Sequence, residues 1–287
     1  MLKKIIKKVL REIRTWLQED SELPRNTLKD PPREFSYQWL NHIVFPKVLG
    51  EGRRPHYLWG VLQGMNLART LGIHRISIAE FGVAGGNGLV ALEEIVERLE
   101  PIFEVQVDIY GFDTGGGLPK PKDYRDIPNT YAEGQFVMDI DRLQKRLKKS
   151  QLKLGLVEET IDDFIQSRPS PLAFFSIDLD FYHATMAALR PLEATSDVLL
   201  PRIWCYFDDI MGPTKSEFTG ERLAISDFNS THEMRKISPI HGLPWALPNR
   251  FFDQVWLKKV YLVHIFDHKD YGKYDELTPM PDLGLKK

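Results

Sequence analysis

The sequence predicts an α/β fold in which a doubly wound, mostly parallel sheet is covered by helices on both faces. Two observations support this prediction. Short apolar strands alternate with helical patterns through the middle of the chain, and the strands repeatedly end in an acid or a glycine-rich turn. Such alternation is typical of sheets in which each crossover helix returns the chain to a parallel neighbour.

The expected elements follow one another in order along the chain. The expected strands are Ile76–Phe81, Val105–Phe112, Leu152–Val157, Ala173–Ile177 and Ile203–Phe207. The expected helices are Gly88–Leu99, Asp139–Lys149, Thr160–Ser167 and Thr185–Arg190. Ligands of open α/β sheets bind beyond the carboxyl ends of the strands, so the residues that follow each strand are the candidates for a site.

The first strand runs into a glycine-rich turn between Glu80 and Gly88. Glycine lets the backbone approach a ligand closely, and the helix that follows offers free N–H groups. The spacing differs from G-x-G-x-x-G, which disfavours a nicotinamide or flavin site without excluding it. Glu80 indicates a ligand with a group to be balanced at the strand end. A turn that joins strand and helix with no ligand is the alternative.

Asp113 ends the second strand about 25 residues past this turn, where nucleotide-binding folds place an acid that accepts hydrogen bonds from ribose hydroxyls. An open loop, Thr114–Pro119, follows it. Asp113 alone carries little weight, because strand ends are often acidic for solubility. Acids at the ends of two successive strands are a more specific arrangement.

The fourth and fifth strands end in paired carboxylates. Asp178 and Asp180 are spaced i, i+2, which puts them on one side if the strand persists that far. Asp208 and Asp209 follow the fifth strand. Neighbouring carboxylates repel one another unless a cation or a proton lies between them, and oxygen ligands suit a hard ion such as Mg²⁺ or Ca²⁺. Acidic loop starts that never converge are the alternative.

Together these blocks resemble the macrocin O-methyltransferase-like group of class I S-adenosylmethionine (AdoMet) methyltransferases. Members of that group are metal-dependent enzymes that methylate sugar hydroxyls of natural products. The resemblance rests on Glu80-x-Gly82-Val83-x-x-Gly86, Gly111-Phe112-Asp113-Thr114-x-x-Gly117-Leu118-Pro119, Ile177-Asp178-x-Asp180-x-Tyr182-x-x-Thr185 and Asp208-Asp209. The chain departs from the family pattern at residues 198–202, where a Gly-Gly turn is usual, and at Gly115-Gly116, where a bulky pair is usual.

The resemblance implies a Rossmann-like, seven-stranded sheet that Val255–Phe266 would close, although Lys258-Lys259 interrupts this apolar stretch. It implies AdoMet as cofactor, Mg²⁺ or another divalent cation, and a small-molecule hydroxyl acceptor such as a saccharide. Asp180 would accept the hydroxyl proton as general base. The residues implied for AdoMet are Glu80, Gly82, Val83, Gly86, Asn87, Asp113 and Thr114, and those for the metal are Asp178, Asp208 and Asp209.

Two other functions stay open. A nicotinamide-dependent oxidoreductase has the same kind of fold, but the chain lacks the glycine fingerprint and an evident proton relay. A binding module that kept the cofactor loop and lost catalysis is the second alternative. The intact set of four acids argues against it.

The overall composition is that of an ordinary soluble globule, with a formal charge of −2 and 43% hydrophobic residues among 287. A nucleic-acid partner is not expected, because it calls for a strongly basic domain. The lone cysteine, Cys205, excludes an internal disulfide, is compatible with the cytoplasm, and is expected to be a buried, inert thiol. No run of about 18 apolar residues predicts a transmembrane helix.

Residues 1–33 are interpreted as a basic amphipathic helix, Met1–Gln18, and a Pro-rich linker, and residues 34–287 as the catalytic domain. We expect the helix to pack on its own domain or on a second subunit of a homo-oligomer. Contact with an anionic membrane surface is the less favoured alternative. The segment Pro119–Asp141 is either an active-site lid or a surface excursion. His183 is expected to start a helix without a catalytic role.

Overall fold

The sheet of the protein has seven strands in the part of the chain that the computed structural model describes, residues 44–49, 54–247, 251 and 253–273. These are β1 (Arg75–Phe81), β2 (Gln106–Asp113), β3 (Gln151–Leu154), β4 (Leu172–Ile177), β5 (Leu199–Phe207), β6 (Arg235–Pro239) and β7 (Val260–Ile265). Their order is β3-β2-β1-β4-β5-β7-β6. The first five strands run parallel to their neighbours, and β7 is antiparallel to both β5 and β6. The predicted mostly parallel sheet is therefore confirmed.

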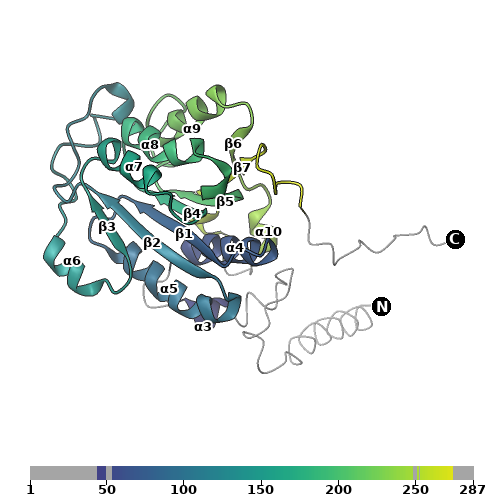
Figure 1. The fold of residues 1–287 in the computed structure, drawn as a ribbon. Helices are drawn as coiled ribbons and strands as arrows, with labels where there is room; N and C mark the ends of the chain where they lie inside the picture. Colours follow the sequence, from purple (N-terminus) through teal and green to yellow (C-terminus); the bar gives the residue numbers. More distant parts are fainter. Residues whose placement is uncertain (1–43, 50–53, 248–250, 252, 274–287) are drawn as a thin grey trace, which may run out of the picture.

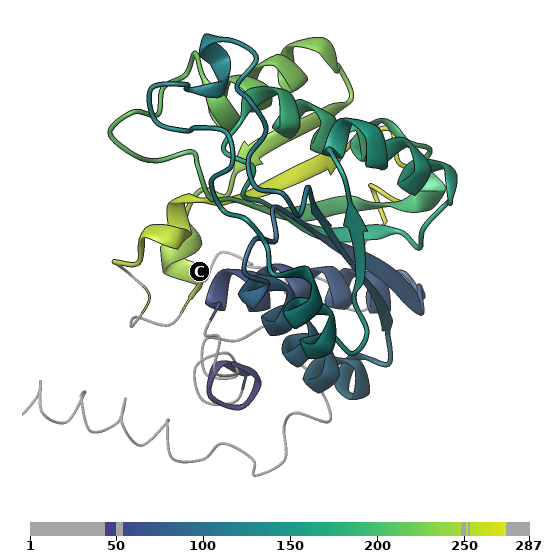
Figure 2. The ribbon, with the colours of Figure 1, turned by 90° about the vertical axis from the view of Figure 1, so that its left-hand side faces the viewer.

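Helices cover both faces of this sheet (Figure 1). On one face lie α3 (Phe45–Val48), α4 (Pro55–Thr70) and α5 (Asn87–Phe103), and on the other lie α7 (Val157–Gln166), α8 (Tyr182–Leu189) and α9 (Gly220–Thr231). The view in Figure 2 shows the same layers from the side. Short helices in the connections are η2 (Tyr124–Asp126), α6 (Ile140–Arg146), η3 (Arg190–Glu193), η4 (Ser196–Val198), α10 (Leu243–Ala246) and η6 (Val255–Lys258).

The central strands β1 and β4 are buried along almost their whole length, since helices shield both of their faces. Helix α4 packs especially closely on β4, because glycines face that strand. A Cβ at Gly60 would lie 2.2 Å from the ring of Phe174, and one at Gly64 would lie 2.9 Å from Ala173. Cys205 is buried in β5, as predicted.

Two of the expected elements are wrong in part. The expected strand Leu152–Val157 stops at Leu154, because Gly155 takes a positive φ of 134° and α7 already begins at Val157. The stretch Val255–Phe266 is a 3-10 turn followed by β7, which joins the sheet only from Val260 onward and lies between β5 and the edge strand β6.

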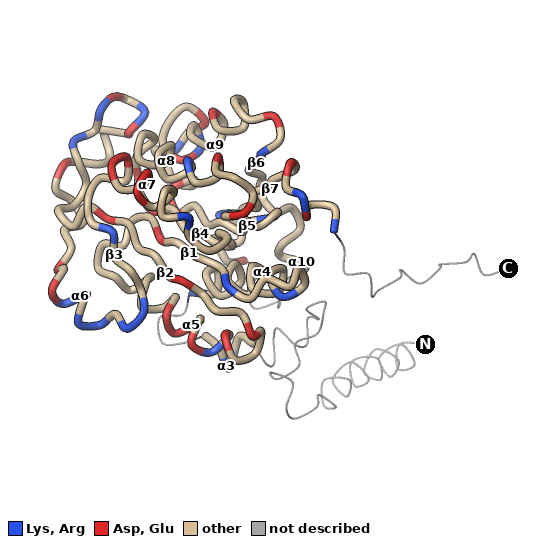
Figure 3. The backbone as a smooth tube through the Cα atoms, viewed as in Figure 1, with Lys and Arg blue, Asp and Glu red and all other residues tan. Residues whose placement is uncertain are grey.

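The expected helix Asp139–Lys149 is also shorter than predicted, since α6 ends at Arg146. The backbone N–H groups of the next residues turn away to the carboxylate of Glu93, with Ser150 N lying 2.7 Å from Glu93 Oε1. Lysines and arginines gather on α6 and just after it, while charges of both signs are mixed over the rest of the trace (Figure 3).

The prediction for Met1–Gln18 falls outside the described residues, and the division of the chain at residue 34 stays a prediction. Within the described ranges, no helix combines the length and the apolar composition that crossing a bilayer requires.

Candidate active site

A cavity of about 440 Å³ lies at the carboxyl ends of β1, β2, β4 and β5. The strand order reverses here between β1 and β4, which is where open α/β sheets bind ligands. Every residue predicted for a site lines this cavity. We call residues 80–88 and 113–117 the glycine half of the cavity. The acidic half consists of Asp178, Asp180, Asp208 and Asp209.

The glycine-rich turn has a shape that other residues would not allow. Gly82 has a φ of 86°, and a Cβ there would lie 1.9 Å from the carbonyl oxygen of Asp178. Gly86 has a φ of 77°, and a Cβ there would lie 2.1 Å from Leu143 of α6. Arg146 holds α6 to the same turn by donating to Asn87 Oδ1 at 3.1 Å. The glycines therefore allow the turn to pack closely against Asp178 and α6 while it lines the cavity.

Asp113 joins the two segments of the glycine half. Its Oδ2 accepts hydrogen bonds from the backbone N–H groups of Val83 at 2.9 Å and Ala84 at 2.8 Å. Its Oδ1 accepts from the N–H of Gly115 at 2.7 Å. Thr114 closes its own loop by donating to the carbonyl of Gly117 at 2.6 Å. The end of β2 and the turn after β1 are thus fixed to each other by one carboxylate.

Glu80 lies almost wholly buried at the base of the cavity. Tyr57 donates a hydrogen bond of 2.7 Å to its Oε1. Its Oε2 is buried and has no hydrogen-bond partner among the described residues. Burial raises the pKa of Glu80 to about 8, against the opposing effects of the Tyr57 hydrogen bond and the Arg54 guanidinium. An unpaired buried oxygen of this kind is suited to a donor group of a ligand.

The segment after β4 carries the first two acids of the acidic half. The strand ends at Ile177, as predicted, so strand alternation does not continue to Asp180. The backbone turns instead, and Asp180 takes a φ of 62°. Both Asp178 and Asp180 nevertheless line the cavity. A non-glycine residue held in the left-handed region is strained, and such strain is common at functional sites.

Asp180 is 6% exposed and lies beside Asp209. Burial and then the charge of Asp209 raise the pKa of Asp180 to about 8. Burial and the charges of Asp208 and Asp209 raise the pKa of Asp178 to about 7. Asp209 Oδ2 is buried and receives no hydrogen bond from the described chain's N–H or hydroxyl donors. A proton shared between Asp180 and Asp209 would satisfy both carboxylates.

Each acid of the pair after β5 holds a lysine. Lys259 Nζ lies 3.0 Å from Asp208 Oδ1, and Lys215 Nζ lies 2.8 Å from Asp209 Oδ1. The Tyr131 hydroxyl also donates to Asp209 Oδ1, at 2.9 Å. Over the described ranges, no three His, Cys, Asp or Glu side chains are arranged to hold one metal ion.

The segment Pro119–Asp141 forms part of the cavity wall through Pro119, Tyr131 and Phe136. This position supports the lid interpretation over a surface excursion. The segment is tied down at its base by Asp126, which is fully buried and accepts hydrogen bonds from the backbone N–H of His183 at 3.1 Å and from its ring Nδ1 at 2.9 Å.

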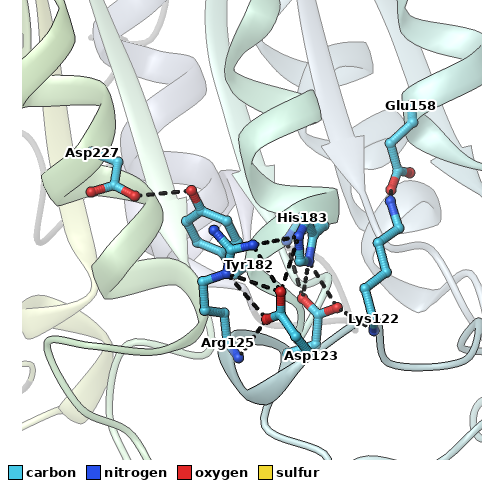
Figure 4. A network of polar contacts seen from close by, with 8 residues as sticks. Lys122, Asp123, Arg125, Glu158, Tyr182, His183 and Asp227 are labelled. Atoms are coloured by element: carbon cyan, nitrogen blue, oxygen red, sulfur yellow. Dashed lines mark hydrogen bonds and ion pairs between the residues drawn. The ribbon is translucent and has the colours of Figure 1, made fainter.

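The other ring nitrogen of His183 lies 3.1 Å from Arg125, which also pairs with Asp123 at 2.8 Å (Figure 4). His183 is the second residue of α8 and stands outside the lining of the cavity. Its contacts are those of a residue that anchors the segment to the helix start, in line with the role expected from the sequence.

Several residues of the site were not predicted from the sequence. Arg54 and Tyr131 line the cavity, and Lys215 and Lys259 contact its acids. All four come from segments with no recognisable motif. The charged pair Lys258-Lys259 inside an otherwise apolar stretch was the one available signal, because a lysine in such a position needs a partner.

Comparisons with known proteins support the fold. No protein-family model and no curated protein matches the chain. Among solved structures, the O-methyltransferase NovP has a TM-score of 0.51 at 13% sequence identity, over 76% of this chain and 87% of that chain. The calicheamicin methyltransferase CalS11 has a TM-score of 0.48 at 22% identity, over 74% and 82% of the two chains. The similarity to NovP shows that this chain has the Rossmann-like fold of such methyltransferases.

Proposed function

We propose that this protein is an AdoMet-dependent methyltransferase that acts on a hydroxyl group of a small molecule. The observation that carries the proposal is that one cavity joins the glycine half to the acidic half. The first suits a nucleoside cofactor, and the second suits removal of a proton from an alcohol. The fold shared with NovP, an O-methyltransferase, adds support.

The glycine half fits AdoMet. The glycine-rich turn lines the cavity with its backbone at Gly82 and Gly86, and the unpaired Glu80 Oε2 is an acceptor for a donor group. Asp113 offers carboxylate oxygens at the cavity wall. AdoMet, when bound, supplies a methyl group on a positively charged sulfur that leaves with the electron pair of the carbon–sulfur bond. The residues proposed to hold it are Glu80, Gly82, Val83, Gly86, Asn87, Asp113 and Thr114.

We assign the general base to Asp180. An alcohol is a poor nucleophile until its proton leaves, so a carboxylate must accept that proton as the alcohol oxygen bonds to the methyl carbon. The pKa of about 8 gives Asp180 the proton affinity that this step needs near neutral pH. Much of the acceleration is expected from holding oxygen and methyl carbon in line inside the cavity.

The divalent cation predicted on Asp178, Asp208 and Asp209 does not fit the donor set. The Oδ1 atoms of Asp208 and Asp209 each carry an ammonium group. A metal ion would have to compete with these ammonium groups for Oδ1, or ligate Asp208 and Asp209 through Oδ2 alone. No step of the proposed reaction is therefore routed through a metal.

The proposed acceptor class is a hydroxyl of a sugar or a similar natural product. This part of the proposal rests on the four sequence blocks that resemble those of macrocin-type enzymes. The outer cavity wall contains Pro119 and Phe136, which suit an apolar portion of such a molecule. A homo-oligomer is also part of the proposal, and light scattering of the full-length protein tests it.

Isothermal calorimetry with AdoMet and with NADH tests the proposal. We expect AdoMet to bind with a Kd on the order of micromolar and NADH not to bind. Tight NADH binding without AdoMet binding would favour the oxidoreductase instead. AdoMet binding with no turnover of labelled AdoMet, across a panel of sugar and polyketide hydroxyls, would favour a silent binding module.

A further inference from the structure

Two lysines place their ammonium groups on the paired acids after β5, one 6 residues from Asp209 and the other 51 residues from Asp208. Lys215 Nζ lies 2.8 Å from Asp209 Oδ1 and also contacts the hydroxyl of Tyr131. Lys259 Nζ lies 3.0 Å from Asp208 Oδ1 and 2.5 Å from the carbonyl oxygen of the same residue. Positive charge is thus fixed at the oxygens where the sequence pattern predicts a metal ion.

The ammonium group of Lys215 lies among side chains that favour a positive charge. Its side chain is 8% exposed and that of Asp209 is 13% exposed, so both ions are largely removed from water. Lys215 Nζ lies 4.4 Å from the centre of the Tyr131 ring, a favourable position for a cation. The N–H of Asp209 donates to the buried Glu221 at 2.8 Å, which fixes the backbone of the pair. Breaking such a buried pair is costly.

Three cationic side chains act on the carboxylates of the acidic half. Lys215, Lys259 and Arg54 act on the three carboxylates that the sequence predicts as metal ligands, and the charges of Arg54 and Lys259 both reach Asp178. A divalent ion on the Oδ1 atoms of Asp208 and Asp209 would have to displace two ammonium groups. It would also leave those ammonium groups without their partners.

We propose that Lys215 and Lys259 take the place of a divalent cation, so that the reaction at this site proceeds without a bound metal ion. The inference rests on the function proposed above. The two lysines hold the carboxylates of Asp208 and Asp209 in position through their ion pairs. No covalent bond to either lysine forms or breaks.

Titration of the full-length protein with Mn²⁺, followed by electron paramagnetic resonance, tests this inference. We expect the wild type to bind no Mn²⁺ up to about 1 mM. Lys215→Met and Lys259→Met each uncover a carboxylate, and each is expected to raise Mn²⁺ affinity by at least about tenfold. Lys149→Met is the matched control. It breaks an ion pair with Glu100 outside the cavity and is expected to change nothing.

Wild-type protein that binds one Mn²⁺ per chain, with binding lost in Asp208→Asn, would overturn the inference. The same holds if neither lysine variant gains affinity while both stay folded by circular dichroism. Should the methionine variants unfold, Lys215→Gln and Lys259→Gln keep a donor without the charge and carry the same expectation.

AdoMet calorimetry on the same samples separates this inference from the proposed function. Binding of both AdoMet and Mn²⁺ by the wild type overturns the inference alone. Failure of the wild type to bind AdoMet overturns the proposed function.

Discussion

The glycine half and the acidic half line the same cavity, but they are stabilised in different ways. In the glycine half, Asp113 is held by backbone N–H groups of the adjacent turn and loop, and the turn itself is shaped by Gly82 and Gly86. In the acidic half, Asp208 and Asp209 are held by the side chains of Tyr131, Lys215 and Lys259. The first half depends on backbone geometry and backbone hydrogen bonds, and the second depends on charge pairing between side chains.

This difference predicts which substitutions affect which function. Changes in the glycine half should alter cofactor affinity and leave the proton-transfer step intact. Changes in the acidic half should alter turnover and its pH dependence at unchanged cofactor affinity. Each variant below either supports or breaks this division.

The largest effect is expected for Asp180→Asn. Loss of the general base should lower turnover by roughly 10²–10⁴-fold while AdoMet affinity stays the same. Steady-state kinetics and calorimetry measure the two quantities. Asp197→Asn, in an exposed pair with Arg168, is the control and should leave both unchanged. Near-normal turnover in Asp180→Asn would remove this residue from the base role.

The next effect concerns the glycine half. Asp113→Ala leaves three backbone N–H groups without their acceptor and removes the proposed partner of the ribose hydroxyls. AdoMet affinity should fall by about 1.5–3 kcal/mol, as expected for charge-assisted hydrogen bonds. Calorimetry measures the loss. Unchanged affinity in a folded variant would contradict the assignment of this half to the cofactor.

A smaller effect is expected for Tyr131→Phe. The variant keeps the ring beside Lys215 and loses the hydrogen bond to Asp209 Oδ1. Turnover should fall about fivefold, the equivalent of one hydrogen bond, at unchanged AdoMet affinity. Comparison with Tyr124→Phe, whose ring is exposed on the same segment, isolates the hydroxyl. An equal loss in both variants would point to a general effect on the segment.

The smallest expected effect concerns the acidic half alone, where Asp180 makes the stability of the protein depend on pH. The pKa of Asp180 is about 8 in the folded protein against an ordinary 3.8, so the folded state binds more protons than the unfolded state between these values. Stability from this group is complete below pH 3.8 and is lost as the pH rises through 8. Asp180→Asn should therefore raise the Tm at pH 8 by about 2–4 °C and less at pH 5. Scanning calorimetry at both values measures this shift, and an equal change at both would contradict it.

The parts predicted well from the sequence are those with local causes. Strands β1, β2 and β4 were predicted within one or two residues, because each is an apolar run bounded by a glycine or an acid. Helix α4 was not predicted, since Gly60 and Gly64 weaken its helical signal and reveal their reason only against β4. The start of β5 was missed because Pro201 and Arg202 interrupt its apolar pattern.

In the candidate site, too, some residues could be predicted from the sequence and others could not. Its strand-end acids and glycines were predicted because topology alone brings them to one edge of the sheet. The side chains that hold the acids were not predicted, because no local sequence pattern shows that Lys215 or Tyr131 contacts Asp209. A metal ion was predicted because the sequence shows no cationic partners for these carboxylates. The partners are Lys215, which lies 6 residues from Asp209 in the chain, and Lys259, which lies 51 residues from Asp208.

A crystal structure with S-adenosylhomocysteine tests the central claim most directly, since the two halves are proposed to serve one reaction in one cavity. The account predicts that the ligand contacts Asp113 and the glycine-rich turn, with Asp180 left facing the remaining space of the cavity. It also predicts that Lys215 and Lys259 keep their contacts with Asp209 and Asp208. A ligand bound away from the turn, or seated so that it covers Asp180 and leaves no room for an acceptor, would contradict the account.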